Sequence, residues 1–168
     1  DLHQTHFDQQ FQKIQQLLAL APGQALLTLL SHRPMWGVNK ADETTAPGHA
    51  DPTGAYAIID QTLQQAYHTH PLPRALDLVL SGHMHRFQAI GFGHDKAASY
   101  PDQLIVGTSG ISLAKNHPTK PFSFPIDGLP GSGFGLSEFA YMEIVPSKKH
   151  GWQGTLKDPS GRKLAACE

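Results

Sequence analysis

Hydrophobic residues recur at helical spacing in two stretches of the first half of the sequence. In residues 7–18 an apolar side chain returns every three or four positions, with glutamines and a lysine between. This spacing predicts an amphipathic helix, capped near Thr5 or Asp8 and ended by the Pro-Gly pair that follows. The same spacing over residues 55–66 predicts a second helix.

Two short runs are apolar almost throughout, which is typical of strands buried on both faces of a sheet. They are ALLTLL at 25–30 and LDLVL at 76–80. Residues 38–54, which lie between them, are polar and rich in turn formers, so they are predicted to form a surface loop. The order strand, loop, helix, strand indicates a parallel βαβ unit.

The second half of the sequence has a different character. Short strand candidates follow one another without a helix between them, at 86–92, 103–107, 139–145 and 152–156. The segment 115–135, which includes GSGFG at its end, is rich in proline and glycine and predicts a long flexible loop. We therefore expect one α/β domain over residues 1–168, with antiparallel strands after the parallel unit.

Composition excludes several classes of function. The formal net charge is −1 and no run of lysine and arginine occurs, so nothing favours a nucleic-acid surface. No apolar run approaches the length of a membrane span. A single cysteine, Cys167, excludes an internal disulfide framework and a cysteine-rich zinc module.

The 11 histidines of the sequence require an explanation, because imidazole is a common metal ligand. His32 and His83 each follow the end of a predicted buried strand, and His85 stands two positions beyond. The carboxyl ends of parallel strands lie at one edge of a sheet, where ligands bind, so the three imidazoles are predicted to converge there as metal ligands. The alternative is that they are polar residues at a strand boundary, as we interpret His68-Thr69-His70 at a helix end.

The stretch His32-Arg33-Pro34-Met35-Trp36, followed by Gly82-His83-Met84-His85 and by GTSG at 107–110, resembles the calcineurin-like metallophosphoesterases. The likeness is to their acid-phosphatase-like branch and extends over residues 7–111, with a β-rich part at 112–168. It implies the C-terminal half of a layered αββα sandwich. It also implies hydrolysis of phosphate esters by two ions of iron, manganese or zinc, about 3.5–4 Å apart, which supply the attacking hydroxide.

By this resemblance His32 and His83 would bind one ion and His85 the other. Arg33 and Trp36 lie beside His32 in the sequence and are candidates for contact with the substrate, and Arg86 could also meet a phosphate. Surface solvation is the simpler explanation for both arginines.

The earlier motifs of the family, which carry the bridging carboxylate and the general-acid histidine, are missing. No Gly-Asp-x-x-Asp occurs, and we interpret Asp1-Leu2-His3 as a coincidental match to Asp-x-His. Asn116-His117 comes after the histidine motif and not before it. We therefore expect a C-terminal portion of a longer phosphoesterase that is inactive alone.

Two alternatives stay open: a non-catalytic binding module of the same fold, and a mononuclear three-histidine site. Cys167 is either a free thiol or the partner of a cysteine elsewhere in the intact protein. The latter, with the acid-phosphatase likeness, favours a location outside the cytoplasm.

Overall fold

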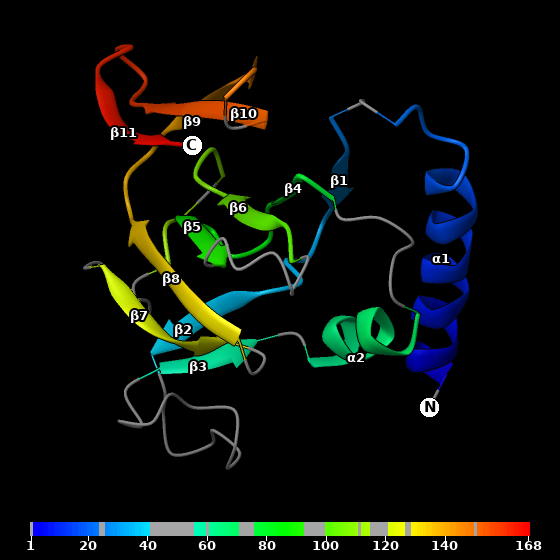
Figure 1. Cartoon of the computed structure of the whole chain (residues 1–168). Helices are drawn as coiled ribbons and strands as arrows, with labels where there is room; N and C mark the ends of the chain where they lie inside the picture. The colour runs from blue at the N-terminus through cyan, green and yellow to red at the C-terminus, as the bar shows by residue number, and fades with distance from the viewer. Residues whose placement is uncertain are drawn as a thin grey trace.

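A mixed α/β arrangement is visible in the computed structural model, which describes residues 2–23, 26–40, 56–59, 61–70, 76–92, 100–110, 112–114, 121–126, 129–149 and 151–168. A six-stranded sheet has helices α1 (Leu2–Leu18) and α2 (Gln61–Thr69) packed on one face and a three-stranded sheet on the other (Figure 1). Neither of these described helices has the length and hydropathy that crossing a membrane requires.

The six-stranded sheet consists of β1 (Thr28–Ser31), β4 (Leu78–Ser81), β6 (Asp102–Val106), β5 (Phe87–Phe92), β8 (Leu129–Leu136) and β7 (Phe122–Ile126), in this spatial order. β1, β4 and β6 are parallel, whereas β5, β8 and β7 are antiparallel to their neighbours. The predicted change from parallel to antiparallel strands is therefore confirmed. We expected β6 among the antiparallel strands, but it is parallel to β4 and antiparallel to β5.

β4 is a buried strand, as predicted. Successive side chains of a strand point to opposite faces, so Leu78 packs under the three-stranded sheet while Val79 joins the cluster beneath the helices. The prediction that β1 is equally buried is wrong. Of the described strands only β4 pairs with it, and Leu30 at this sheet edge is 74% exposed.

The connection from β1 to β4 differs from the prediction. Residues expected in the surface loop begin with a strand, β2 (Gly37–Lys40), in which Val38 is fully buried. The predicted second helix divides into β3 (Tyr56–Ile59), antiparallel to β2, and the shorter α2. The β-branched pair Ile58-Ile59 suits a pleated strand better than a helix, and a hairpin therefore precedes the helix of this crossover.

The first helix begins earlier than its apolar spacing indicated. It starts at Leu2, so Thr5 and Asp8 lie inside the helix and not at its N-cap position, and this detail of the prediction is wrong. The Leu2-His3 part of the Asp-x-His match is also helical, which supports its interpretation as a coincidence. Phe11 and its neighbours pack against α2 and the sheet.

The segment 115–135 is not one long loop. Its described residues form β7 and most of β8, and GSGFG lies within β8. Its glycines have a packing reason: a Cβ on Gly131 would lie 2.5 Å from Ile126 Cδ1, and one on Gly133 would overlap the Ala89 carbonyl. Glycine here marks close approach of two strands, which loop-like composition conceals.

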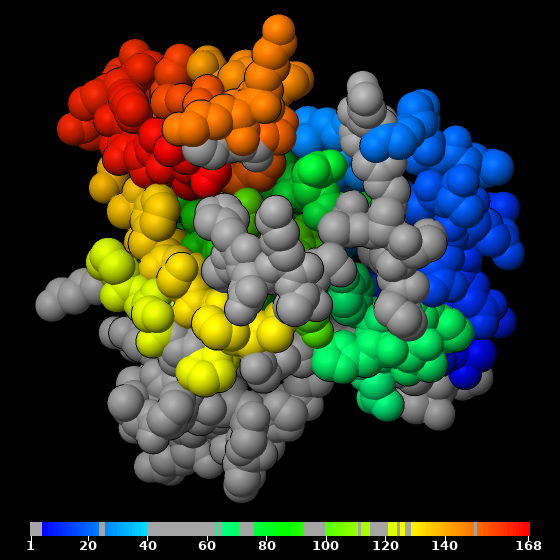
Figure 2. All heavy atoms as spheres, in the orientation of Figure 1, coloured from blue at the N-terminus to red at the C-terminus, as the bar shows by residue number. Residues whose placement is uncertain are grey.

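The three-stranded sheet comprises β9 (Tyr141–Ser147), β10 (Gly151–Lys157) and β11 (Lys163–Cys167), all antiparallel. It caps the molecule opposite α2 (orange and red in Figure 2). Trp152 and Leu156 bury their side chains against the six-stranded sheet. We did not predict β11, although Asp158-Pro159-Ser160-Gly161 is a strong turn signal.

Replacing Gly133 with alanine should lower the free energy of unfolding by roughly 1–3 kcal/mol. The new methyl group would collide with the backbone of β5 and come within 2.7 Å of the Phe122 ring. Gly110→Ala is the matched control, because a Cβ there meets nothing within 4 Å. Chemical denaturation of both variants measures the difference, and equal stability would contradict the packing described for β8.

Candidate metal centre

His32 and His83 lie side by side at the carboxyl ends of β1 and β4. The parallel register pairs Ser31 with Ser81, so each histidine leaves the sheet from the same edge. His83 Nδ1 is 3.1 Å from His32 Nε2, and the rings meet at 74° with centroids 4.9 Å apart. The predicted convergence of these two imidazoles is confirmed.

The spacing of the two nitrogens fits a shared metal ion. Two imidazole nitrogens, each about 2.0–2.1 Å from one tetrahedral ion, lie about 3.3 Å apart, and somewhat closer when the angle at the ion is smaller. Both side chains are exposed, so an ion could reach them. In the absence of an ion, one ring donates a hydrogen bond to the other.

His85 does not join this pair as the simple spacing suggested. Side chains two apart point the same way only in extended chain, whereas His83 and His85 have left-handed φ values of 64° and 50°. The described residues contain no group of three His, Cys, Asp or Glu side chains placed to hold an ion. The role of His85 as a ligand of a second ion stays a prediction.

The loop that carries His83 and His85 is tightly folded. The Met84 N–H donates to the Gly82 carbonyl at 2.7 Å, and the Ala114 N–H donates to the His85 carbonyl. Left-handed φ at residues other than glycine costs about 1–3 kcal/mol each and is concentrated at functional sites. The paired outliers therefore mark this loop as specialised.

Trp36 is not available to a substrate. Its side chain is fully buried, and its indole packs against three aromatic rings, those of Tyr67, Phe92 and Tyr100. The prediction of a substrate contact is corrected here: the indole anchors the segment after His32 in the core. Arg33, in contrast, is exposed and borders, with His32, a hollow of about 390 Å³ between β1 and α1.

Arg86 is neither a solvated surface residue nor an evident phosphate ligand. It is 1% exposed, and its Nη2 donates to the Val38 carbonyl at 3.0 Å and to Asn39 Oδ1. Its Nε is buried without a partner in the described structure, and burial lowers the pKa of the guanidinium to about 10. Arg86 thus ties the β2–β3 hairpin to the loop of His83 and His85.

A second hollow, of about 520 Å³, opens on the other side of β1. It is bordered by His32, Gly82 and apolar side chains of β1, β4 and β9, among them Leu30, Leu80 and Ile144. Hollows therefore flank the exposed β1 edge on both faces, and both reach His32.

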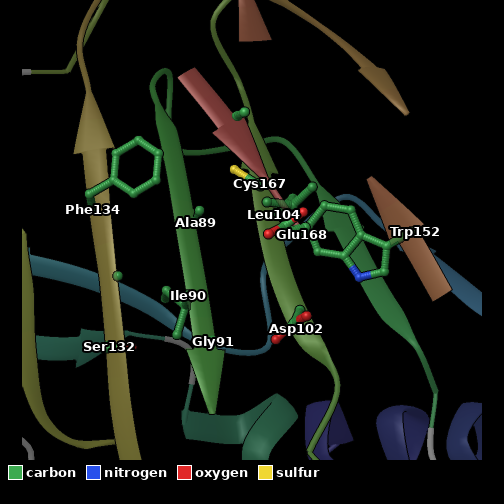
Figure 3. A pocket seen from close by; sticks show the side chains of 12 residues that line it. Ala89, Ile90, Gly91, Asp102, Leu104, Ser132, Phe134, Trp152, Cys167 and Glu168 are labelled. Atoms are coloured by element: carbon green, nitrogen blue, oxygen red, sulfur yellow. The ribbon is translucent and has the colours of Figure 1, made fainter. Parts of the chain in front are cut away.

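A third hollow, of about 330 Å³, lies between the two sheets and is bordered by Trp152, Asp102, Cys167 and Glu168 (Figure 3). Asp102 begins β6, so this hollow is at the opposite end of the parallel strands from the histidine pair. Burial, followed by the nearby Asp102 charge, raises the pKa of the Cys167 thiol to about 11.

Comparison with known proteins gives a match in structure but none in sequence. No protein-family model and no curated protein matches the sequence. The structure is similar to that of purple acid phosphatase PPD1 from yellow lupin (Lupinus luteus) seeds, with a TM-score of 0.56 and 18% identity. The fold is therefore similar to that of part of a purple acid phosphatase. The match covers 94% of this chain and 27% of the lupin protein, so the chain spans about a quarter of that protein's length.

This likeness agrees with the family resemblance in the sequence, and its 27% coverage of the lupin protein is consistent with a part of a longer chain. At 18% identity it concerns the fold alone. The ligand roles of His32, His83 and His85 stay predictions.

Folded Cys167 should react slowly with iodoacetamide near pH 8. Only the thiolate is the nucleophile, and a pKa near 11 in place of the usual 9.0 reduces its fraction about 100-fold at that pH. The rate should rise as pH approaches 11. Mass spectrometry of the folded chain, with the guanidinium-unfolded chain as control, measures both rates; similar rates in the two states would contradict this environment.

Proposed function

We propose that this chain supplies the C-terminal histidine ligands of a dinuclear metal site that hydrolyses phosphate esters. His32 and His83 bind one ion, and His85 binds the second; the ions are iron, manganese or zinc. The observation that carries the proposal is the 3.1 Å approach of His32 and His83 at the carboxyl ends of parallel strands. Its support is the similarity of the surrounding fold to a purple acid phosphatase.

In this proposal the remaining ligands come from another part of the intact protein; the described residues bring no carboxylate to the histidine pair. The β1 edge supports this division. Leu30 there is 74% exposed and no described strand pairs on its outer side, so a further strand of the αββα sandwich fits beside His32. Carboxylates at the end of that strand would complete the two coordination shells.

Each of the proposed site residues has a defined task in such a site. When bound, the ions polarise the phosphoryl oxygens and provide the nucleophile. His32 and His83 would coordinate through the nitrogens of neutral imidazoles. Arg33, exposed at the rim of the hollow beside His32, offers a positive charge to the phosphate group.

A second candidate is a non-catalytic metal-binding or interaction module of the same fold. The observation in its favour is that the described residues cluster two imidazoles but no third ligand. Such a module would hold one ion without hydrolysing any ester, in this chain and in the intact protein alike.

Metal content and turnover of p-nitrophenyl phosphate distinguish these candidates. The change is His83→Ala/His85→Ala, and the matched control is His68→Ala/His70→Ala, which removes the other His-x-His pair of the chain. We expect the first variant to lose bound metal and the control to retain it. Neither should show turnover, since the described residues bring no carboxylate to the histidine pair.

The same substitutions in the intact protein should abolish turnover and leave the control active. Equal metal content in the wild-type chain and the His83→Ala/His85→Ala variant would refute the metal site. Metal binding without turnover by the intact protein would favour the non-catalytic module.

A further inference from the structure

One buried amide bonds to both chain segments that carry the histidine pair. Gln103, on β6, is fully buried and makes hydrogen bonds with both of its polar atoms. Its neighbours in the sheet are β4 on one side and β5 on the other. It was not among the residues that the sequence singled out, because a glutamine in a strand carries no motif.

The two ends of this amide contact the two segments that carry the histidines. Oε1 accepts from the Met35 N–H at 3.0 Å and from the Trp36 N–H at 3.5 Å, just after His32. Nε2 donates to Ser81 Oγ at 2.9 Å, two residues before His83, and to the Val79 carbonyl at 3.2 Å. A single side chain therefore bridges both segments.

The orientation of the amide is fixed by its partners, since N–H donors surround one end and oxygen acceptors the other. A direct contact reinforces the bridge, because the Gly82 N–H donates to the His32 carbonyl at 3.2 Å. Without Gln103, the Met35 N–H would be buried without its acceptor, which favours a shift of the segment away from β4. Such a shift would carry His32 with it.

We propose that Gln103 is a positioning residue that sets the separation of the His32 and His83 imidazoles and thereby the affinity of the pair for a divalent transition metal. The part that concerns metal rests on the proposed function. The part that concerns the spacing of the rings stands without it.

The chain offers a matched control in Gln88. It is equally buried, on the adjacent strand β5, and it also bonds to the backbone of the segment after His32. Its Oε1 accepts from the Val38 N–H at 2.8 Å and its Nε2 donates to the Val38 carbonyl at 3.0 Å. Both of these bonds hold the β2 strand, and neither reaches β4 or the His83 segment.

The test compares Gln103→Leu with Gln88→Leu in the 168-residue chain, by two measurements. The first is the ¹⁵N spectrum of the imidazole nitrogens without metal, which detects the hydrogen bond between His32 and His83. The second is calorimetric titration with Ni²⁺. Ser81→Ala, which removes only one acceptor of the Gln103 amide, is a milder variant that serves if Gln103→Leu does not fold.

We expect Gln103→Leu to lose the imidazole hydrogen-bond signal and to bind Ni²⁺ about tenfold more weakly, at the lower end of effects seen for residues that orient metal ligands. Ser81→Ala should weaken the imidazole hydrogen-bond signal and the Ni²⁺ affinity as well, each by a smaller factor. Gln88→Leu should retain the signal and the affinity, although it also loses buried hydrogen bonds.

Equal behaviour of Gln103→Leu and Gln88→Leu in the metal-free spectrum would overturn the inference and leave Gln103 as an ordinary buried amide. If Ser81→Ala is measured in place of Gln103→Leu, an imidazole ¹⁵N spectrum equal to that of the wild type would also overturn the inference. Failure of the wild-type chain to bind Ni²⁺ would count against the proposed function instead, since the spectrum without metal still tests the positioning role.

Discussion

The parallel pairing of β1 with β4 is the contact on which the candidate site depends. Ser31 and Ser81 end the two strands in register, and the residues that follow them are therefore delivered to one edge of the sheet. Fifty-one positions of sequence separate the histidines that meet there. Because β1 has a neighbour on one side only among the described strands, the same pairing leaves the site at an open flank of the sheet.

Buried polar side chains bond to the backbone that follows His32, and of these only Gln103 also reaches β4. Gln103, Gln88 and Arg86 are all fully or almost fully buried, and each bonds to the backbone of residues 35–38. A buried polar group with its partners satisfied fixes one arrangement of the chain, since any other leaves costly unpaired groups. The segment after His32 is thus determined by specific hydrogen bonds in addition to the packing of Trp36.

The sequence predicted the parts of the fold that depend on local periodicity and on strand order. β4 was recognisable as an apolar run and β5 as a short strand candidate, and the meeting of His32 with His83 followed from the parallel arrangement. It could not predict that β1 is an edge, because an apolar run looks the same whether or not a second neighbour covers it. Nor could it reveal Gln103, whose importance lies in partners that are remote along the chain, or the turn that separates His85 from the pair.

The order of the strands gives the histidine loop an unusual path. β4 and β5 are consecutive in the sequence but not adjacent in the sheet, because β6 lies between them. Residues 82–86 must therefore arch over the carboxyl end of β6, where Gly107 stands. A Cβ at that position would lie 2.8 Å from the backbone nitrogen of His85. Because glycine carries only a hydrogen there, residues 82–86 can pass close to the end of β6. The distance of His83 and His85 from the end of the sheet therefore depends on Gly107, a residue without a side chain.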